Sequence, residues 1–239
     1  MAVDLNADVG EGYGRWSLGD DDSLMPIITS ANVACGFHAG DPSTIRRTCA
    51  SAVEHGVTIG AQVSYPDLAG FGRRFIDIDP AELVDAVLYQ IGALQALAAS
   101  AGGVVRYVKP HGALYNAVVH HEAQAAAVVD AIVSHGGRLA LMGLPGTCVE
   151  SVAIARGVRF VREGFADRGY RPDGTLVPRR EAGALLDAPE AVVEQTEWLV
   201  GRGVESVCVH SDTPGAASLA TAARATLERL GVGPAPFDR

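Results

Sequence analysis

Residues 104–116 read VVRYVKPHGALYN and contain the pattern that decides the fold. A short run rich in valine ends at Lys109, and Pro110 and His111 follow before a helical pattern begins. Such an apolar run is typical of a strand that is covered on both faces of a parallel sheet. Ionisable residues directly after the run are expected where a barrel gathers its chemistry, at the carboxyl ends of its strands.

The same arrangement recurs along the chain. We expect strands at residues 3–8, 31–34, 57–63, 104–109, 138–142, 158–163 and 204–210. Reactive or polar residues stand at or just beyond most strand ends, namely Asp8, His38, Gln62, Lys109, His111, Glu163, Asp167, His210 and Asp212. Helical patterns separate the strands, which predicts right-handed βαβ units. Because the polar residues follow many strands, we predict an α/β fold, a single-domain (β/α) barrel of about seven parallel strands over residues 1–239.

Proline and glycine mark where the helices begin and end. The pairs Asp41-Pro42, Asp79-Pro80 and Thr213-Pro214 each place a capping side chain before a proline, and Pro189 marks another start. Glycines follow the helical runs at residues 56, 102, 136, 157, 203 and 231, as left-handed C-terminal caps require. Two long loops, residues 64–79 and 164–187, are expected to cover or line a site.

Composition excludes several classes of partner. The chain has 239 residues, 48% hydrophobic and 20% charged, with a net charge of −9. An acidic chain is repelled by nucleic acids and by anionic membranes. No apolar run approaches the roughly 20 residues of a membrane helix, and the N-terminus lacks a signal-peptide pattern. The four scattered cysteines fit a reducing compartment, so we expect a cytoplasmic protein without disulfides.

One lysine, Lys109, stands among eighteen arginines. Lysine is a compact point charge, whereas arginine is a wide planar fork, so the exception points to a specific position for this ammonium. Among the histidines, His38, His111 and His210 lie just beyond strand ends and are candidates for chemistry. The remaining histidines are at helix termini, where a structural role accounts for them.

Four segments carry a family resemblance. They read DLNADVGEG (4–12), NVACGFHAGD (32–41), KPHGALYN (109–116) and FADRGY (165–170), followed by HSDTPG (210–215). In this order they resemble the LamB/YcsF lactam-utilisation family, over essentially the whole chain. The resemblance implies a barrel related to the polysaccharide deacetylases and the cleavage of 5-oxoproline to L-glutamate with ATP hydrolysis. It also implies two partner proteins, the B and C subunits of 5-oxoprolinase.

The resemblance also bears on cofactors. In the wider deacetylase superfamily an Asp and two His typically hold a divalent metal, and Asp8 and His38 match two of these positions. Many family members carry a histidine in the segment that here reads Gly60-Ala61-Gln62-Val63, so Gln62 argues against a tightly bound metal. No P-loop is present, because the one lysine lies in Val-Lys-Pro-His. We therefore expect ATP to be shared with, or bound by, the partner subunits.

These observations assign roles to the residues. Asp8 or Glu11 is the candidate general base, His111 the acid for the departing ring nitrogen, and Lys109 the charge that stabilises a developing oxyanion or phosphate. The substrate's carboxylate is assigned to Arg73, Arg168 or Arg179. The other expected substrate-binding residues are His38, Gln62, Asp167 and His210. Three further residues either orient the site or cap loops, namely Tyr115, Asn116 and Asp212.

Two alternatives remain open at this stage. The first is a metal-dependent N-deacetylase on the same barrel, which Gln62 disfavours and the metal content of the purified protein would decide. The second is a non-catalytic protein that docks its partners. The convergence of ionisable groups argues against a scaffold, and substitutions that leave the activity of the assembled complex intact would favour it.

Overall fold

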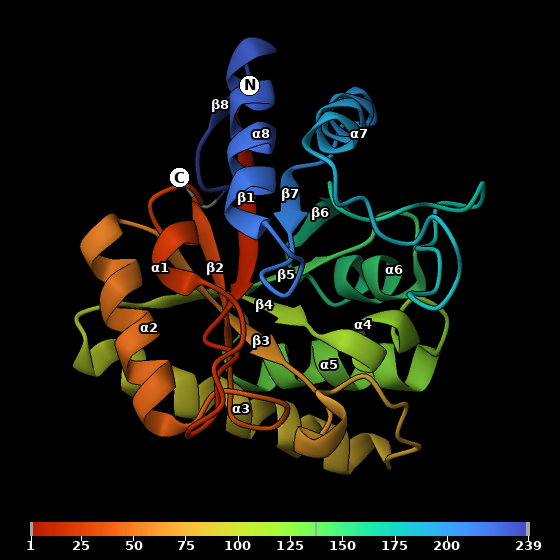
Figure 1. The fold of residues 1–239 in the computed structure, drawn as a ribbon. Helices are drawn as coiled ribbons and strands as arrows, with labels where there is room; N and C mark the ends of the chain where they lie inside the picture. Colours follow the sequence, from red (N-terminus) through yellow and green to blue (C-terminus); the bar gives the residue numbers. More distant parts are fainter. Residues whose placement is uncertain (1, 137, 238–239) are drawn as a thin grey trace.

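The computed structural model describes residues 2–136 and 138–237, which form a closed parallel barrel (Figure 1). The barrel strands are β1 (Ala2–Val9), β2 (Ser30–Ala34), β3 (Thr58–Val63), β4 (Val105–Pro110), β5 (Ala140–Gly143), β6 (Phe160–Phe165) and β7 (Ser206–Val209). Each strand pairs with the next in chain order, and β1 pairs with both β7 and β2. The predicted seven-stranded (β/α) barrel is confirmed.

A short eighth strand, β8 (Gly233–Pro234), was not predicted. It pairs with β1 at Ala2 and Val3, near the amino-terminal end of the barrel. The ring of Phe237 then packs against Tyr107, with ring centroids 5.3 Å apart. The last described part of the chain therefore covers the barrel end that lies opposite the strand termini at which chemistry is expected.

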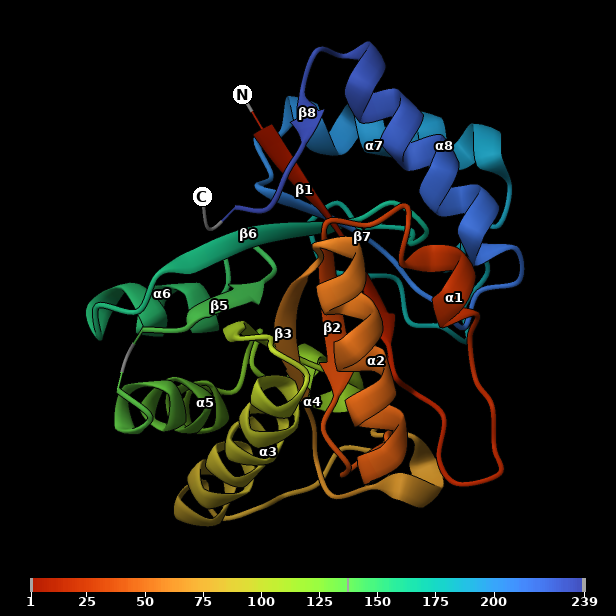
Figure 2. The ribbon, with the colours of Figure 1, turned by 90° about the vertical axis from the view of Figure 1, so that its left-hand side faces the viewer.

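Helices surround the barrel, as two perpendicular views show (Figures 1 and 2). They are α1 (Asp21–Leu24), α2 (Pro42–His55), α3 (Pro80–Ser100), α4 (Gly112–Ala117), α5 (Glu122–Ser134), α6 (Cys148–Ala155), α7 (Pro189–Gly201) and α8 (Ala216–Arg229). Asp41 and Asp79 cap α2 and α3 by accepting hydrogen bonds from backbone N–H groups of the first turn. The helix starts at Pro42, Pro80 and Pro189 are confirmed.

The predicted start of the last helix at Thr213-Pro214 is wrong. Helix α8 begins at Ala216, after Gly215 in a left-handed conformation with φ of 77°. Gly215 rather than Thr213 is the N-cap residue, and the Thr213 hydroxyl donates to Asp167 Oδ2, 3.0 Å away. The Thr213 hydroxyl thus takes part in a contact between two distant loops.

Helix α3 corrects the expectation about membrane-length segments. By length and composition alone this 21-residue helix could cross a membrane, since an 18-residue window within it has a mean hydropathy of 1.3. In the fold, however, its side chains at Leu83, Val87, Ile91 and Leu94 are fully buried in the main hydrophobic core. This spacing of three or four residues is that of a helix packed on a barrel.

The barrel interior is unusually polar. Along β1 the residues Val3, Leu5 and Ala7 join the hydrophobic core, whereas Asp4, Asn6 and Asp8 alternate with them and bond to other strands. Branched aliphatic side chains usually fill this space. Here a hydrogen-bonded column runs through the barrel and carries the side chains that stand at its carboxyl end.

Candidate active site

The first feature of the site is a buried ammonium at the carboxyl end of the barrel. Lys109 projects from β4 and is 2% exposed. Its Nζ lies 2.6 Å from Glu163 Oε1 and 3.3 Å from Asp8 Oδ1, and it donates to Asn6 Oδ1 at 3.0 Å. Burial lowers the pKa of Lys109, but the facing carboxylates outweigh it and hold the pKa well above the usual value. Lys109 is therefore charged.

Asp8 takes its charge state from this arrangement. Burial raises the pKa of Asp8, but Lys109 and the nearby His111 outweigh burial, so the net pKa is well below the ordinary value. Asn32 Nδ2 also donates to Asp8 Oδ1, 2.9 Å away. Asp8 is thus a fixed carboxylate that is held by two donors.

Below Lys109 the column continues through hydrogen-bonded amides. Asn6 Nδ2 donates to Ser206 Oγ at 2.7 Å, and Asn32 Nδ2 donates to Asn6 Oδ1 at the same distance. The Tyr107 hydroxyl donates to Asn32 Oδ1 at 2.6 Å. These contacts orient the Asn6 amide with its oxygen toward the ammonium and the Asn32 amide with its Nδ2 toward Asp8.

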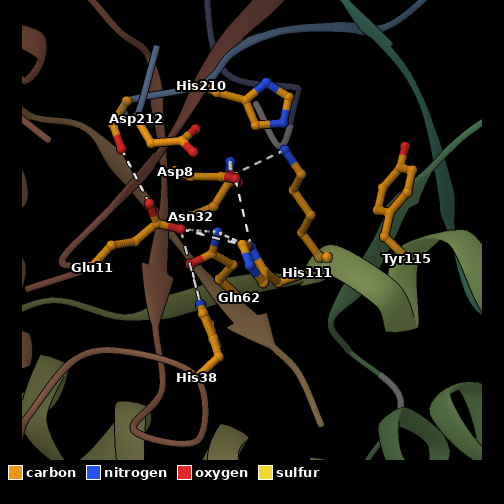
Figure 3. A network of polar contacts seen from close by, with 12 residues as sticks. Asp8, Glu11, Asn32, His38, Gln62, His111, Tyr115, His210 and Asp212 are labelled. Carbon is orange, nitrogen blue, oxygen red and sulfur yellow. Dashed lines mark hydrogen bonds and ion pairs between the residues drawn. The ribbon is translucent and has the colours of Figure 1, made fainter. Parts of the chain in front are cut away.

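The second feature is a cluster around Gln62, shown in Figure 3. Gln62 Nε2 donates to Glu11 Oε1 at 2.9 Å and lies 3.0 Å from His111 Nδ1, while Gln62 Oε1 lies 3.2 Å from His38 Nε2. His111 Nε2 is 3.0 Å from the Phe71 carbonyl and must carry a proton to donate to it. Both ring nitrogens of His111 are therefore engaged.

The electrostatics of this cluster differ from those at Lys109. Burial, and then the charge of Asp8, raise the pKa of Glu11 to about 8. Burial and the neighbouring His111 lower the pKa of His38 well below its usual value, so His38 is neutral. Asp8 and Glu11 thus have pKa values moved in opposite directions, a separation that is typical of acid–base sites.

The third feature is a carboxylate–imidazole pair. Asp167 follows β6 and lies 2.9 Å from His210 Nδ1, and it accepts a hydrogen bond from the His210 backbone N–H at 3.0 Å. Burial raises the pKa of Asp167, but His210 outweighs this effect and the net pKa is lowered. The Phe165 ring stacks on the imidazole, with centroids 5.1 Å apart. Asp167 therefore orients the His210 ring through its Nδ1, and the Nε2 atom on the other side of the ring points away from Asp167.

Arginines form the rim of the site. Arg73 and Arg179 both face Asp212, at 2.5 Å and 3.7 Å. Burial raises the pKa of Asp212, but the two guanidinium groups lower it below the ordinary value. Arg168 lies apart from this pair, because its buried side chain donates to the carbonyls of Ala184 and Val177 within its own loop. Two of the three predicted carboxylate-binding arginines thus meet at one place.

The fold family raises the question of a metal, and the residues do not fit one as they stand. The ligand atoms of Glu11, His38 and His111 lie within 4.8 Å of one another. The predicted ligand Asp8 is outside this set and is paired with Lys109. Within the set, Gln62 already donates to Glu11 Oε1 and to His111 Nδ1, which are the lone pairs that a cation would need.

Two residues that were expected either to orient the site or to cap loops take different roles. The Tyr115 hydroxyl donates to Glu163 Oε2 at 2.9 Å and so orients the carboxylate that faces Lys109. Asn116 instead bonds to the Gly112 carbonyl of its own helix, 3.0 Å away. Tyr115 therefore belongs to the site, whereas Asn116 makes a local contact.

Three residues of the site were missed in the sequence. Asn6, Asn32 and Ser211 all bond to ionisable groups there, and the Ser211 hydroxyl lies 3.2 Å from Glu11 Oε2. A signal for Asn6 was available, since polar residues alternate with apolar ones along DLNAD at residues 4–8. In a barrel strand this alternation places the polar side chains on the inner face.

Comparison with known proteins identifies relatives that match nearly the whole chain. The sequence profile of the LamB/YcsF family matches residues 3–239. A Cutibacterium acnes protein, named as the A subunit of 5-oxoprolinase, is 55% identical over an alignment 247 positions long that covers 96% of each chain. A Mycolicibacterium gilvum protein of the same name is also 55% identical, with 99% of each chain covered.

Solved structures extend the comparison. A lactam utilization protein from Thermus thermophilus superposes with a TM-score of 0.93 at 39% identity, covering 99% of this chain and 100% of the other. A family 4 carbohydrate esterase from Streptomyces lividans shares the fold alone, with a TM-score of 0.54 and 14% identity, and 99% and 93% of the two chains covered. From the profile and the whole-length identities, the chain is a member of the LamB/YcsF family.

Proposed function

We propose that this chain is the A subunit of an ATP-dependent 5-oxoprolinase, which hydrolyses the lactam of 5-oxo-L-proline to L-glutamate. The observation that carries the proposal is whole-length identity of 55% to proteins that are named as this subunit. The site supports a hydrolase because carboxylates, imidazoles and an ammonium converge where the barrel strands end. A protein that only docked partners would have no use for such a buried set.

A lactam is a weak electrophile, so the proposal includes activation of its oxygen by ATP. Phosphorylation of that oxygen would make the ring carbon electrophilic enough for attack by water, and the C–N bond would then break to leave γ-glutamyl phosphate. A second water would hydrolyse this acyl phosphate to L-glutamate and inorganic phosphate. ATP is a co-substrate, shared with or bound by the B and C subunits. We further propose that the chain is cytoplasmic and that it binds neither nucleic acids nor membranes.

Glu11 is the preferred general base. Its pKa of about 8 lies near a working pH, which is where a base both accepts a proton readily and is available to do so. Asp8 is the second candidate, but its pair with Lys109 makes it a weaker base. Lys109 contributes a fixed positive charge that would favour the developing oxyanion or phosphate.

The departing ring nitrogen needs a proton as the C–N bond breaks. His111 was the first choice from the sequence, yet both of its ring nitrogens have partners. His210 fits this task better, because Asp167 holds Nδ1 and leaves Nε2 to exchange a proton. Arg73 and Arg179 would hold the substrate carboxylate, which would compete with Asp212 for the two guanidinium groups.

Reconstitution tests the function. We expect the chain alone to form little glutamate from 5-oxoproline and ATP, and the chain with B and C subunits to form it with matching ATP hydrolysis. In that complex Glu11→Gln should lose about 10²-fold or more of the activity, the scale of one proton-transfer role. Asp85→Asn, an exposed change on α3, is the matched control. A wild-type complex without ATP-dependent glutamate formation would refute the proposal.

A further inference from the structure

One buried amide organises three ionisable side chains in this protein. Gln62 is fully buried on β3, and its side chain bonds to Glu11, His38 and His111 at once. The three groups follow three different strands, and within the described chain this is the cluster where two imidazoles and a carboxylate approach closely enough for one cation. The amide sits between them (Figure 3).

Each contact of Gln62 uses an atom that a cation would need. The two N–H groups of its Nε2 point at Glu11 Oε1 and His111 Nδ1, 2.9 Å and 3.0 Å away. His111 Nε2 donates to the Phe71 carbonyl, and His111 Nδ1 is the unprotonated nitrogen because it accepts from the Gln62 amide N–H. His38 Nε2 donates to Gln62 Oε1, so its lone pair is also absent at that atom.

The rings themselves are arranged for the amide. His38 and His111 stack with centroids 4.1 Å apart and planes 13° from parallel. Imidazole lone pairs lie in the ring plane, so two stacked rings direct them side by side. A zinc ion needs nitrogen lone pairs that converge on one point about 2.0–2.1 Å from each atom.

We propose that the Gln62 carboxamide is a built-in substitute for a divalent cation. It supplies, through two N–H groups and one carbonyl, the positive and negative ends that hold Glu11, His111 and His38 in place. The wild-type site is therefore independent of metal, and a latent metal site appears when the amide is replaced by a ligand. The cluster has this property whatever substrate the protein acts on.

The test is gain of metal binding in Gln62→His and Gln62→Glu. Replacing the amide frees the lone pairs of Glu11 and His111 and adds a fourth ligand, a set that suits a transition metal. Chelator-treated protein is titrated with Co²⁺ by calorimetry and visible absorption. We expect each variant to bind one Co²⁺ at least about tenfold more tightly than wild type, and His111→Ala in either background to abolish the gain.

Controls make the result decisive. Gln90→Glu changes another fully buried glutamine, one that bonds to the backbone of Ser64 outside the cluster, and it should gain no affinity. Thermal melting identifies variants that fold. Tight binding of one Co²⁺ per chain by the wild type would overturn the proposal, and that titration requires no variant. Folded Gln62 variants that bind no more tightly than wild type would overturn it equally.

Discussion

At the scale of single residues, burial of the Lys109 ammonium decides what a substitution there costs. Its charge is balanced by Asp8 and Glu163, neither of which is more than 4% exposed. Removing one member of a buried ion pair leaves an uncompensated charge, whereas removing both charges costs much less. The same ammonium is thus a component of stability as well as of the site.

We predict that Lys109→Met lowers the free energy of unfolding by about 3–5 kcal/mol. The double variant Lys109→Met, Glu163→Gln should lose less, because a neutral amide replaces one of the two unpaired carboxylates and can still accept from Tyr115. Urea unfolding of wild type and the two variants at pH 7 measures the difference. A double variant less stable than the single one would contradict this account of the pair.

Asp4 lies at the other end of the polar column, and its raised pKa predicts that the stability of the protein depends on pH. Burial raises its pKa to about 6 from an ordinary 3.8, although Ser206, Ser30 and Thr29 donate to it and oppose the shift. The fold favours the protonated form of Asp4. The stability that this preference contributes is fully present below pH 3.8 and is lost as the pH rises through about 6.

Asp4→Asn removes this titration. Between about pH 4 and pH 7.5 its stability relative to wild type should therefore rise by about 3 kcal/mol, from a shift of roughly two pKa units. Denaturant unfolding at several pH values across this range measures the trend, with Asp85→Asn on the exposed face of α3 as control. Parallel pH curves for wild type and Asp4→Asn would show that Asp4 is not so perturbed.

At the scale of elements, the loop between β3 and α3 illustrates how tightly the site is built. Gly72 has a positive φ of 66°, and a Cβ there would overlap Ser64 Oγ and lie 2.9 Å from the His111 ring. Its carbonyl also accepts from the Ala113 N–H at the start of α4. This glycine therefore allows the loop to pass directly over the histidine pair.

We predict that Gly72→Ala is more destabilising than Gly14→Ala by about 1–3 kcal/mol, the usual cost of overpacking. Gly14 is the matched control, because it shares a positive φ of 59° but has no atom within 4 Å of an added Cβ. Melting temperatures of the two variants should differ by about 2–4 °C per kcal/mol. Equal melting temperatures would mean that the Gly72 contacts relax freely.

The elements that could be predicted are those whose signals are local. Short apolar runs located the seven barrel strands, and Asp-Pro pairs located the starts of α2 and α3. The predicted start of α8 was two residues too early, because the N-cap position is taken by Gly215 in a left-handed conformation, which the Thr213-Pro214 pair does not signal.

At the scale of the whole molecule, barrel topology explains why the candidate site could be predicted only in outline. Closure brings every strand end to one place, so Asp8, Lys109 and His210 had to be neighbours of some kind. Which atoms meet depends on strand register and side-chain direction, and neither is encoded in a local pattern. Hence the contact of Lys109 with Glu163 and the turn of Arg168 into its own loop became visible only in the folded chain.

The burial of the one lysine has a practical consequence for labelling chemistry. Reagents that acylate lysine side chains find only Lys109 in this chain, and it is 2% exposed in the native fold. The native surface therefore offers such reagents no lysine side chain, and their reaction with Lys109 would report unfolding. A lysine introduced at a chosen surface position would become the one reactive lysine side chain there. Crosslinking from a series of such positions could then map where a partner protein docks, one attachment point at a time.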